Sequence, residues 1–294
     1  MTDAAAGGER GRTRGALMIA LAAGSWGTWS LFFRPAEARG GVNAALEAFV
    51  VFATIFVASL PLALRERLRV RRPLRVWALL GLQGVFDAAN ALLFFWAMQK
   101  TSLAVAVLTH YLAPVLVALG APFVVGERVS RRTWGALGVA LAGLVTLLEP
   151  WRDGSKIALG GALLGAGSAV FFAMSLLAAK RLGRHFAPTE ILCWHIPTGL
   201  LVMLPFLPSN VLSTPPTALG LLVLGGLGPG AVAGVLFIRG LAHTHASRAS
   251  ILMLLEPVVA VVVGVVAWNE VPSWPAWLGG ALVLAAAYWV LAER

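Results

Sequence analysis

The amino-acid sequence predicts an all-α integral membrane protein with ten transmembrane helices, arranged as two inverted five-helix repeats. Three observations support this fold class. Of the 294 residues, 59% are hydrophobic and 12% are charged, whereas a soluble domain has about 25% charged residues. Apolar segments long enough to cross a bilayer recur along the whole chain. The second half of the chain also repeats the pattern of the first at one constant offset.

The apolar segments contain roughly 17–25 residues each, enough to cross about 30 Å of hydrocarbon as a helix. The strands of a membrane barrel would instead appear as short segments of alternating hydrophobicity. The predicted helices are residues 15–33, 43–64, 74–98, 102–125, 132–148, 157–179, 188–207, 217–240, 247–268 and 273–291.

An internal repeat aligns the two halves of the chain at an offset of 143 residues. The pairs that this offset brings together include Leu112 with Leu255, Pro114 with Pro257, Glu127 with Glu270, Trp134 with Trp277, and Gly24-Ser25 with Gly167-Ser168. We therefore expect a disordered basic tail at 1–14, a first repeat at 15–149 and a second repeat at 157–291.

The distribution of positive charge predicts the orientation. With the N-terminus inside, 18 of the 23 Arg and Lys residues fall in cytoplasmic loops and tails, as the positive-inside rule requires. Both termini are then cytoplasmic, in the cell membrane, which for a bacterium is the inner membrane. Because each repeat has an odd number of helices, the second enters the membrane from the opposite side. Inverted repeats are typical of secondary transporters, whose substrate site lies near the midplane between the halves.

The same residues carry a family resemblance. Each repeat has a proline followed thirteen residues later by a glutamate, Pro114 to Glu127 and Pro257 to Glu270, and then a final helix that contains Trp and Gly. This arrangement over residues 15–291 resembles the EamA domain of the drug/metabolite transporter superfamily. The resemblance implies a ten-helix carrier that moves a small metabolite or drug, commonly outward. The second copy departs from the first in having Asn269 where the first has Gly126.

One polar stripe lies in the third predicted helix. Gln83, Asp87, Asn90 and Phe94 are spaced four, three and four residues apart and so share one face. Polar groups within lipid are costly and mark pathways by default. Asp87 and Asn90 are therefore candidates for the substrate pathway. The alternative is a clamp between helices, in which Asn90 or a neighbouring helix holds Asp87.

A second carboxylate, Glu256, lies in the middle of the ninth predicted helix, directly before Pro257. The proline lacks an N–H and clashes with the carbonyl of Met253, so we expect a kink there. Glu256 is a candidate to bind a proton or a cationic, amine-bearing substrate, and with Asp87 it forms the set of proton-coupling candidates. Alternatively it is a structural carboxylate paired with a buried donor such as His110.

His110 and Tyr111 precede the matching proline of the fourth predicted helix. The repeat offset places Ala113, and not His110, at the position equivalent to Glu256. His110 is either a relay that approaches Glu256 across the pseudo-twofold axis or a hydrogen-bonded packing residue. Tyr111 is included in the predicted pathway.

Aromatic side chains supply the apolar part of the predicted site. Trp26 and Trp29 lie three residues apart in the first helix, deeper than an interfacial belt, where they could line a pathway or surround a cation. Trp194 and His195, which precede Pro197 in the seventh helix, are weaker candidates of the same kind.

Four further glutamates lie near helix ends. We interpret Glu127 and Glu270 as structural groups in the caps of the helices that follow them, with Ser130 and Ser273 as the capping hydroxyls. Glu47 and Glu190 are ambiguous because the same helix-dipole argument applies to them. The inner cavity is expected between helices one, three, four, six, eight and nine, with helices five and ten at the periphery.

Several functional classes are disfavoured by the sequence. It contains no P-loop, no dinucleotide fingerprint, no zinc-protease motif and no nucleophile elbow, and one cysteine excludes a Cys-based metal site. We expect no cofactor, no metal and no nucleic-acid partner. The expected partners are a small-molecule substrate, the lipid bilayer and protons, and the expected assembly is a monomer or weak homodimer. A secondary active transporter is favoured over two alternatives. A membrane-embedded enzyme is disfavoured because the short loops leave no room for a water-exposed active site. A scaffold or receptor is disfavoured because it gains nothing from polar groups at the midplane.

Overall fold

The computed structural model describes residues 2–68, 70–151, 158–209 and 211–292, and within these ranges every regular element is helical. The elements of the first half are α1 Thr2–Trp26, α2 Ser30–Glu37, α3 Ala44–Arg65, α4 Leu74–Lys100, α5 Leu103–His110, α6 Ala113–Val124 and α7 Arg131–Leu148. Those of the second half are α8 Leu159–Leu182, α9 Pro188–Trp194, α10 Ile196–Met203, the 3₁₀ turns Leu204–Phe206 and Val211–Ser213, α11 Pro216–Gly225, the π-helical segment η3 Gly226–Val232, α12 Ala233–His243, α13 Ala246–Leu252, α14 Leu255–Trp268 and α15 Trp274–Ala292.

Nine helical segments of the described chain are long and apolar enough to cross a membrane. The predicted span at 132–148 forms the single helix α7 but is not one of the nine. Its 18 residues begin with Arg131 and Arg132, which lower the mean hydropathy of the whole helix. The protein is thus an all-helical, multi-pass membrane protein, while the count of ten spans stays a prediction.

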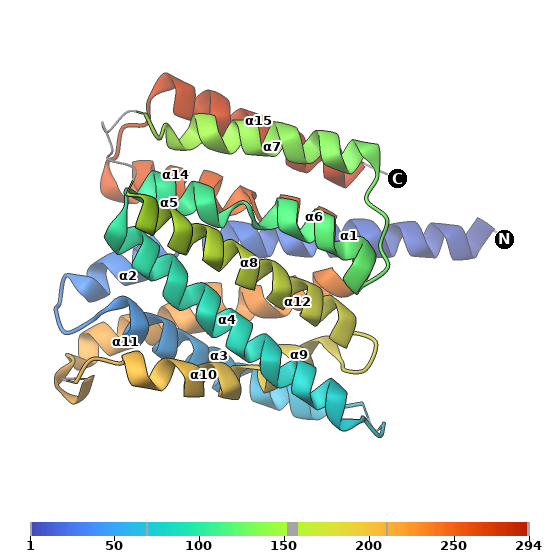
Figure 1. Cartoon of the computed structure of the whole chain (residues 1–294), viewed down its shortest axis with the longest axis horizontal. Helices are drawn as coiled ribbons and strands as arrows, with labels where there is room; N and C mark the ends of the chain where they lie inside the picture. The colour runs from blue at the N-terminus through green and yellow to red at the C-terminus, as the bar shows by residue number, and fades with distance from the viewer. Residues whose placement is uncertain (1, 69, 152–157, 210, 293–294) are drawn as a thin grey trace.

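The expectation of a disordered N-terminal tail is corrected by the structure, in which α1 already begins at Thr2. Its first turns extend beyond the rest of the bundle (Figure 1). Tail residues 2–14 continue without a proline into the apolar part of the same helix, and adding a residue to an existing helix costs far less than starting a new one.

Opposite helix directions in the two halves are visible in Figure 1. The N- and C-termini lie at the same end of the bundle, and α8, which opens the second half, starts at the other end. Helices α7 and α15 pack on each other along one edge of the bundle (Figure 1). Opposite directions are what an inverted repeat requires, and the edge position of α7 and α15 matches the periphery predicted for helices five and ten.

Four of the predicted spans are interrupted midway by a short non-helical turn. Two of these turns precede Pro114 and Pro257, at the α5–α6 and α13–α14 junctions. The carbonyl of Met253, which Pro257 cannot bond, accepts a hydrogen bond from the N–H of Glu256 at 3.0 Å. The predicted kink before Pro257 is therefore confirmed. A third interruption, between α9 and α10, lies at His195 before Pro197.

The fourth interruption separates α1 from α2 at residues 27–29 and was not expected, because no proline lies there. Packing explains it: a Cβ added at Gly27 would lie 2.6 Å from the carbonyl oxygen of Glu256 and 2.6 Å from Cβ of Val259. The turn of the first span thus rests directly against the interrupted part of the ninth. In the eighth span, Gly228-Pro229-Gly230 lies within the π-helical segment η3.

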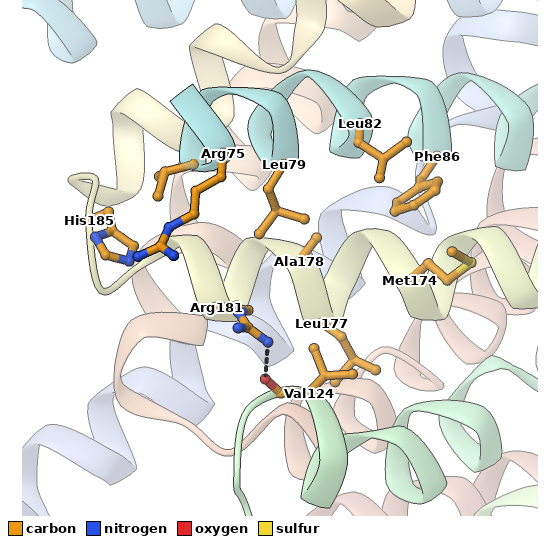
Figure 2. A pocket seen from close by; sticks show the side chains of 11 residues that line it. Arg75, Leu79, Leu82, Phe86, Val124, Met174, Leu177, Ala178, Arg181 and His185 are labelled. Atoms are coloured by element: carbon orange, nitrogen blue, oxygen red, sulfur yellow. Dashed lines mark hydrogen bonds between the residues drawn. The ribbon is translucent and has the colours of Figure 1, made fainter. Parts of the chain in front are cut away.

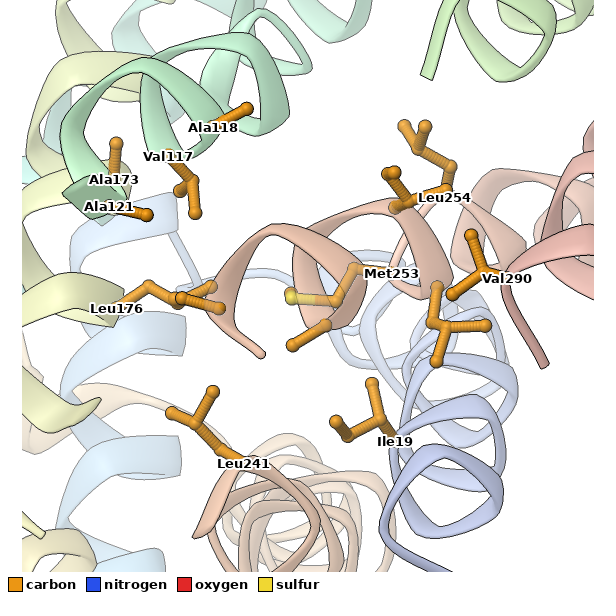
Figure 3. Packing of buried hydrophobic residues seen from close by; sticks show 14 of the residues in the cluster. Ile19, Val117, Ala118, Ala121, Ala173, Leu176, Leu241, Met253, Leu254 and Val290 are labelled. Carbon is orange, nitrogen blue, oxygen red and sulfur yellow. The ribbon is translucent and has the colours of Figure 1, made fainter. Parts of the chain in front are cut away.

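The main hydrophobic core surrounds the α13–α14 turn. Figure 3 shows Met253 and Leu254 between side chains of other helices, including Ile19 of α1, Leu241 of α12 and Val290 of α15. Met253 and Leu254 are 5% and 0% exposed. This core holds the interrupted helix in place and leaves the next residues, Leu255 and Glu256, only half-buried beside it.

Candidate functional site

One polar cluster forms where the α5–α6 and α13–α14 turns meet. The hydroxyl of Tyr111, at the end of α5, is hydrogen-bonded to the carboxylate of Glu256, in the first turn of α14. Tyr111 is buried, whereas Glu256 is half-buried. Among the described residues no cationic side chain forms an ion pair with Glu256. The contact joins residues far apart in sequence, as the predicted approach of the two proline-containing helices requires.

His110 lies beside this cluster but does not bind Glu256. Its Nδ1 is 2.8 Å from Oγ of Ser168, and this hydroxyl donates to the carbonyl oxygen of Gly165, also at 2.8 Å. Because a carbonyl only accepts, the Ser168 proton is used there and His110 Nδ1–H must be the donor to Ser168. The pairing of Glu256 with His110 is thus corrected: the tyrosine that follows the histidine supplies the donor.

Ser168 is a site residue that the candidate set did not include. A signal for it was present in the sequence, because Gly167-Ser168 is the repeat partner of Gly24-Ser25. Close approach explains why the neighbouring residue Gly165 is a glycine. A Cβ at Gly165 would overlap the side chain of Thr109 on α5. Helices α5 and α8 therefore pack closely enough for the His110–Ser168 contact.

Aromatic rings surround His110 on three sides. The ring centroids of Phe94, Tyr111 and Phe172 lie 4.6, 5.2 and 5.5 Å from that of the imidazole. Trp26 packs against Phe237 of α12 with centroids 5.3 Å apart. Phe94 belongs to the predicted stripe of α4, so the stripe and the histidine share one aromatic environment.

The two other tryptophan candidates pack elsewhere. Trp29 stacks on Phe33 of α2 with centroids 5.0 Å apart, and Trp194 meets the edge of Phe56 on α3 at 6.3 Å. Each of these contacts is an ordinary aromatic packing contact. The structure does not join Trp29 or Trp194 to the Glu256 cluster.

A second polar cluster centres on Asp87 of α4. Its Oδ2 lies 3.0 Å from Nε2 of His195, at the turn between α9 and α10. The side chains of Asp87 and His195 are 20% and 8% exposed. The neighbouring-helix alternative for Asp87 is therefore observed, with His195 as the partner in place of Asn90. In the same stripe, Oε1 of Gln83 and Oδ1 of Asn90 are buried without a hydrogen-bond partner among the described residues.

The glutamates at helix ends behave differently from the capping prediction. Ser130 and Ser273 do accept from backbone N–H groups three residues on. Glu127, however, accepts from the N–H of Ala246 at the start of α13 and pairs with Lys180 at 3.4 Å. Glu270 pairs with Arg34 at 2.7 Å. Neither carboxylate caps the helix that follows it, because loop geometry directs each toward the other half of the chain.

The remaining two glutamates have separate environments. Glu190 accepts from Arg72 Nη2 at 2.8 Å and from the N–H groups of Leu68 and Ala187. Glu47 is 3% exposed and lies near Glu37, and its Oε1 has no hydrogen-bond partner among the described residues. Glu190 thus holds the α3–α4 loop against α9, a structural role. Among the described residues no three His, Cys, Asp or Glu side chains converge to hold a metal ion.

An apolar groove of about 590 Å³ lies between α4, α6 and α8, apart from both polar clusters. Figure 2 shows Leu79, Leu82 and Phe86 on one wall, with Arg75, Arg181 and His185 at one end. Arg181 donates to the carbonyl oxygen of Val124 at 3.2 Å. None of the predicted site residues lines this groove, so its volume says nothing about a substrate at the polar centre.

Known proteins resemble this chain over most of its length. An "Uncharacterized transporter" of Archaeoglobus fulgidus is 34% identical over 92% of this chain and 94% of its own length. A "Probable terminal-alkyne amino-acid exporter" of Streptantibioticus cattleyicolor is 30% identical, with 88% of each chain covered. The "Pseudopaline exporter CntI" of Pseudomonas aeruginosa is 26% identical over 71% of this chain and 72% of its own.

The fold is shared with a solved crystal structure that is 24% identical in sequence, with a TM-score of 0.77 over 95% of this chain and 98% of that one. The family model described as "EamA-like transporter family" matches this chain twice, at residues 13–148 and 159–292. Together the two matches cover most of the sequence. The resemblance stated from the proline and glutamate spacing is thus confirmed: the chain belongs to the EamA-like transporter family.

Proposed function

We propose that this protein is a secondary active exporter of a small, polar, amine-bearing metabolite, driven by protons that move in the opposite direction. It would work by alternating access of two inverted halves in a cytoplasmic membrane, with both termini inside. The observation that carries the proposal is the half-buried carboxylate of Glu256 at the meeting point of two interrupted helices. A carboxylate at membrane depth costs free energy, and by default it indicates a functional site.

Glu256 is the element of the site that would bind the amine. Its partner among the described residues is a neutral hydroxyl, that of Tyr111, so no cationic side chain neutralises the negative charge there. A carboxylate removed from water is stabilised either by a proton or by a cation. Binding of an ammonium group and binding of a proton are therefore alternatives at the same oxygen atoms. This competition couples the two movements without any nucleotide site.

The helix termini at the same place favour a second charge on the substrate. The N-terminal ends of α6 and α14 both lie at the interrupted turns, where the helix dipole places a positive partial charge. The first turn of α14 contains Glu256, but that of α6 contains no acidic residue. An anionic group of the substrate would find its place at the N-terminus of α6. An amino-acid-like zwitterion fits both ends, and one relative is named as an amino-acid exporter.

Counterflow in proteoliposomes tests the proposal. Vesicles loaded with one unlabelled compound from a panel of amino acids, amines and nucleosides are diluted into the same compound in labelled form. We expect labelled compound to enter transiently for compounds with a primary amine, and more strongly when a carboxylate is also present. Protein-free vesicles are the control. Counterflow of nucleosides but of no amine would contradict the role given to Glu256, and no counterflow at all would contradict transport of these classes.

A further inference from the structure

The imidazole of His195 has an oxygen atom at each of its nitrogens. Nδ1 is 2.7 Å from the carbonyl oxygen of Ile191, and Nε2 is 3.0 Å from Oδ2 of Asp87. The carbonyl can only accept, so Nδ1 must carry a hydrogen. A neutral imidazole has one N–H, and its Nε2 would then turn a lone pair toward a carboxylate oxygen. The observed contact forms only if one further proton lies on Nε2 or on Asp87.

The opposite tautomer does not remove this requirement. If Nε2 carried the only hydrogen, it would donate to Asp87, and Nδ1 would meet the carbonyl oxygen of Ile191 with a lone pair at 2.7 Å. Two hydrogen bonds to two acceptors need two hydrogens. We propose that Asp87 and His195 form a proton-binding site that holds one exchangeable proton inside the membrane and releases it during transport. This inference rests on the proposed function for its transport step only, and it concerns a site separate from Glu256.

Helix geometry fixes one side of the site. His195 lies at the turn between α9 and α10, and Pro197 follows it. The imidazole binds the carbonyl four residues before it, at the C-terminal end of α9, where carbonyl groups lack intrahelical partners. The hydroxyl of Thr198 donates to the carbonyl oxygen of Gly81 at 2.9 Å and so holds α10 against α4. The proton requirement therefore follows from the backbone as well as from the side chains.

The helices that pack around Asp87 and His195 contain other ionisable side chains, most of which lie near helix ends. Near the interruptions of their spans, Cys193 lies beside the carbonyl oxygen of Phe56, and His110 is bonded to Ser168. The others lie within the first or last two turns of their helices: Glu47 and Arg65 of α3, Arg75 and Lys100 of α4, Lys180 and Arg181 of α8, Glu190 of α9, and Arg239 and His243 of α12. Among the described residues none of them forms an ion pair with Asp87 or His195, whose ionic contact is with each other.

Release of the proton has a structural consequence. Two lone pairs would then face each other at the observed distance of 3.0 Å, and their repulsion would separate α4 from the α9–α10 turn. Gly84, one turn before Asp87, permits the close packing, because a Cβ there would overlap the carbonyl oxygen of His195. The oxygens of Gln83 and Asn90, which share a helix face with Asp87, are buried without a hydrogen-bond partner among the described residues.

The protonation state is measurable without any substrate. ¹⁵N-histidine NMR of the protein in lipid nanodiscs reports whether each ring nitrogen carries a hydrogen, with His195→Gln used to assign the signal and His185→Gln as the control. We expect either a doubly protonated His195 ring or an infrared C=O band of a protonated carboxyl that Asp87→Asn removes. The Asp87→Asn amide can donate to Nε2, so the contact survives and the ring becomes neutral. A neutral wild-type ring with no such band would overturn the proton-binding site.

Release during transport has its own readout. A pH-sensitive dye trapped in proteoliposomes records the protons that leave an acidic lumen during net uptake of compounds from the amine panel. We expect Asp87→Asn to reduce the protons moved per compound taken up to about half, because the proton exchanged at Glu256 remains, while counterflow continues. An unchanged proton flux would overturn the release step even if the NMR result stands. If wild-type vesicles show no counterflow, the proposed function fails, and the NMR measurement still decides whether the pair holds a proton.

Discussion

Ion pairs in this protein differ widely in burial, and burial determines what each contributes to stability. Arg72 and Glu190 are 3% and 0% exposed, and Arg72 also lies 4.1 Å over the ring of Phe186. Arg34 and Glu270 are 47% and 50% exposed, with Arg34 over the ring of Trp268 at 5.3 Å. The chemistry is the same in both pairs, but water can replace a lost partner only in the exposed one.

Replacing Arg72 by Met should lower the free energy of unfolding by about 3–5 kcal/mol, because it leaves Glu190 buried without its cation. The matched control, Arg34→Met, should change it by less than about 1 kcal/mol. Unfolding in detergent micelles, followed by circular dichroism, measures both variants. Equal losses would mean that the α3–α4 loop does not depend on the buried pair.

Interrupted spans are the main feature at the scale of elements, and their predictability depends on their cause. The turns before Pro114, Pro197 and Pro257 follow from local covalent chemistry, since proline has no N–H to continue the helix. The turn between α1 and α2 follows from packing of Gly27 on Glu256 and Val259, which lie more than two hundred residues away in sequence. The helical form of residues 2–14 was not predicted either, because these residues are helical as a continuation of the apolar part of α1.

Gly27→Ala tests the packing explanation. The added Cβ would meet backbone and Cβ atoms of α14, and overpacking of this kind costs typically about 1–3 kcal/mol. Gly138→Ala is the matched control, because a Cβ added to this helical glycine meets nothing within 4 Å, and alanine is favoured over glycine in helices by about 1 kcal/mol. Thermal unfolding should therefore shift downward for the first variant and not for the second. The same shift in both would contradict a packing origin of the turn.

At the scale of the whole molecule, the sequence predicted the helical membrane fold, the approach of the two proline-containing helices and the edge position of α7 and α15. The partners of the buried polar groups were not predictable, because they depend on which helices become neighbours. Tyr111 with Glu256 and Asp87 with His195 each join separate helices. The number of membrane crossings and the orientation remain predictions, which labelling can test.

Cysteine labelling tests the orientation. In a Cys193→Ser background, Trp151→Cys should react with a membrane-impermeant maleimide on intact cells. Arg67→Cys should react only after the membrane is permeabilised, because the arginine-rich loop is expected inside. Labelling of Arg67→Cys from outside would contradict the inverted arrangement and the orientation together.

Proton-driven accumulation of an amine-bearing compound tests the account most directly. Proteoliposomes with a lumen more acidic than the bath should concentrate the compound that gives counterflow, because protons leaving the lumen drive substrate inward through an exchanger. Glu256→Gln should lose accumulation but retain some, weakened counterflow, since the amide keeps the size of the side chain but not the charge that binds the amine. Accumulation by Glu256→Gln equal to that of the wild type, with the same dependence on the pH gradient, would contradict coupling at this carboxylate.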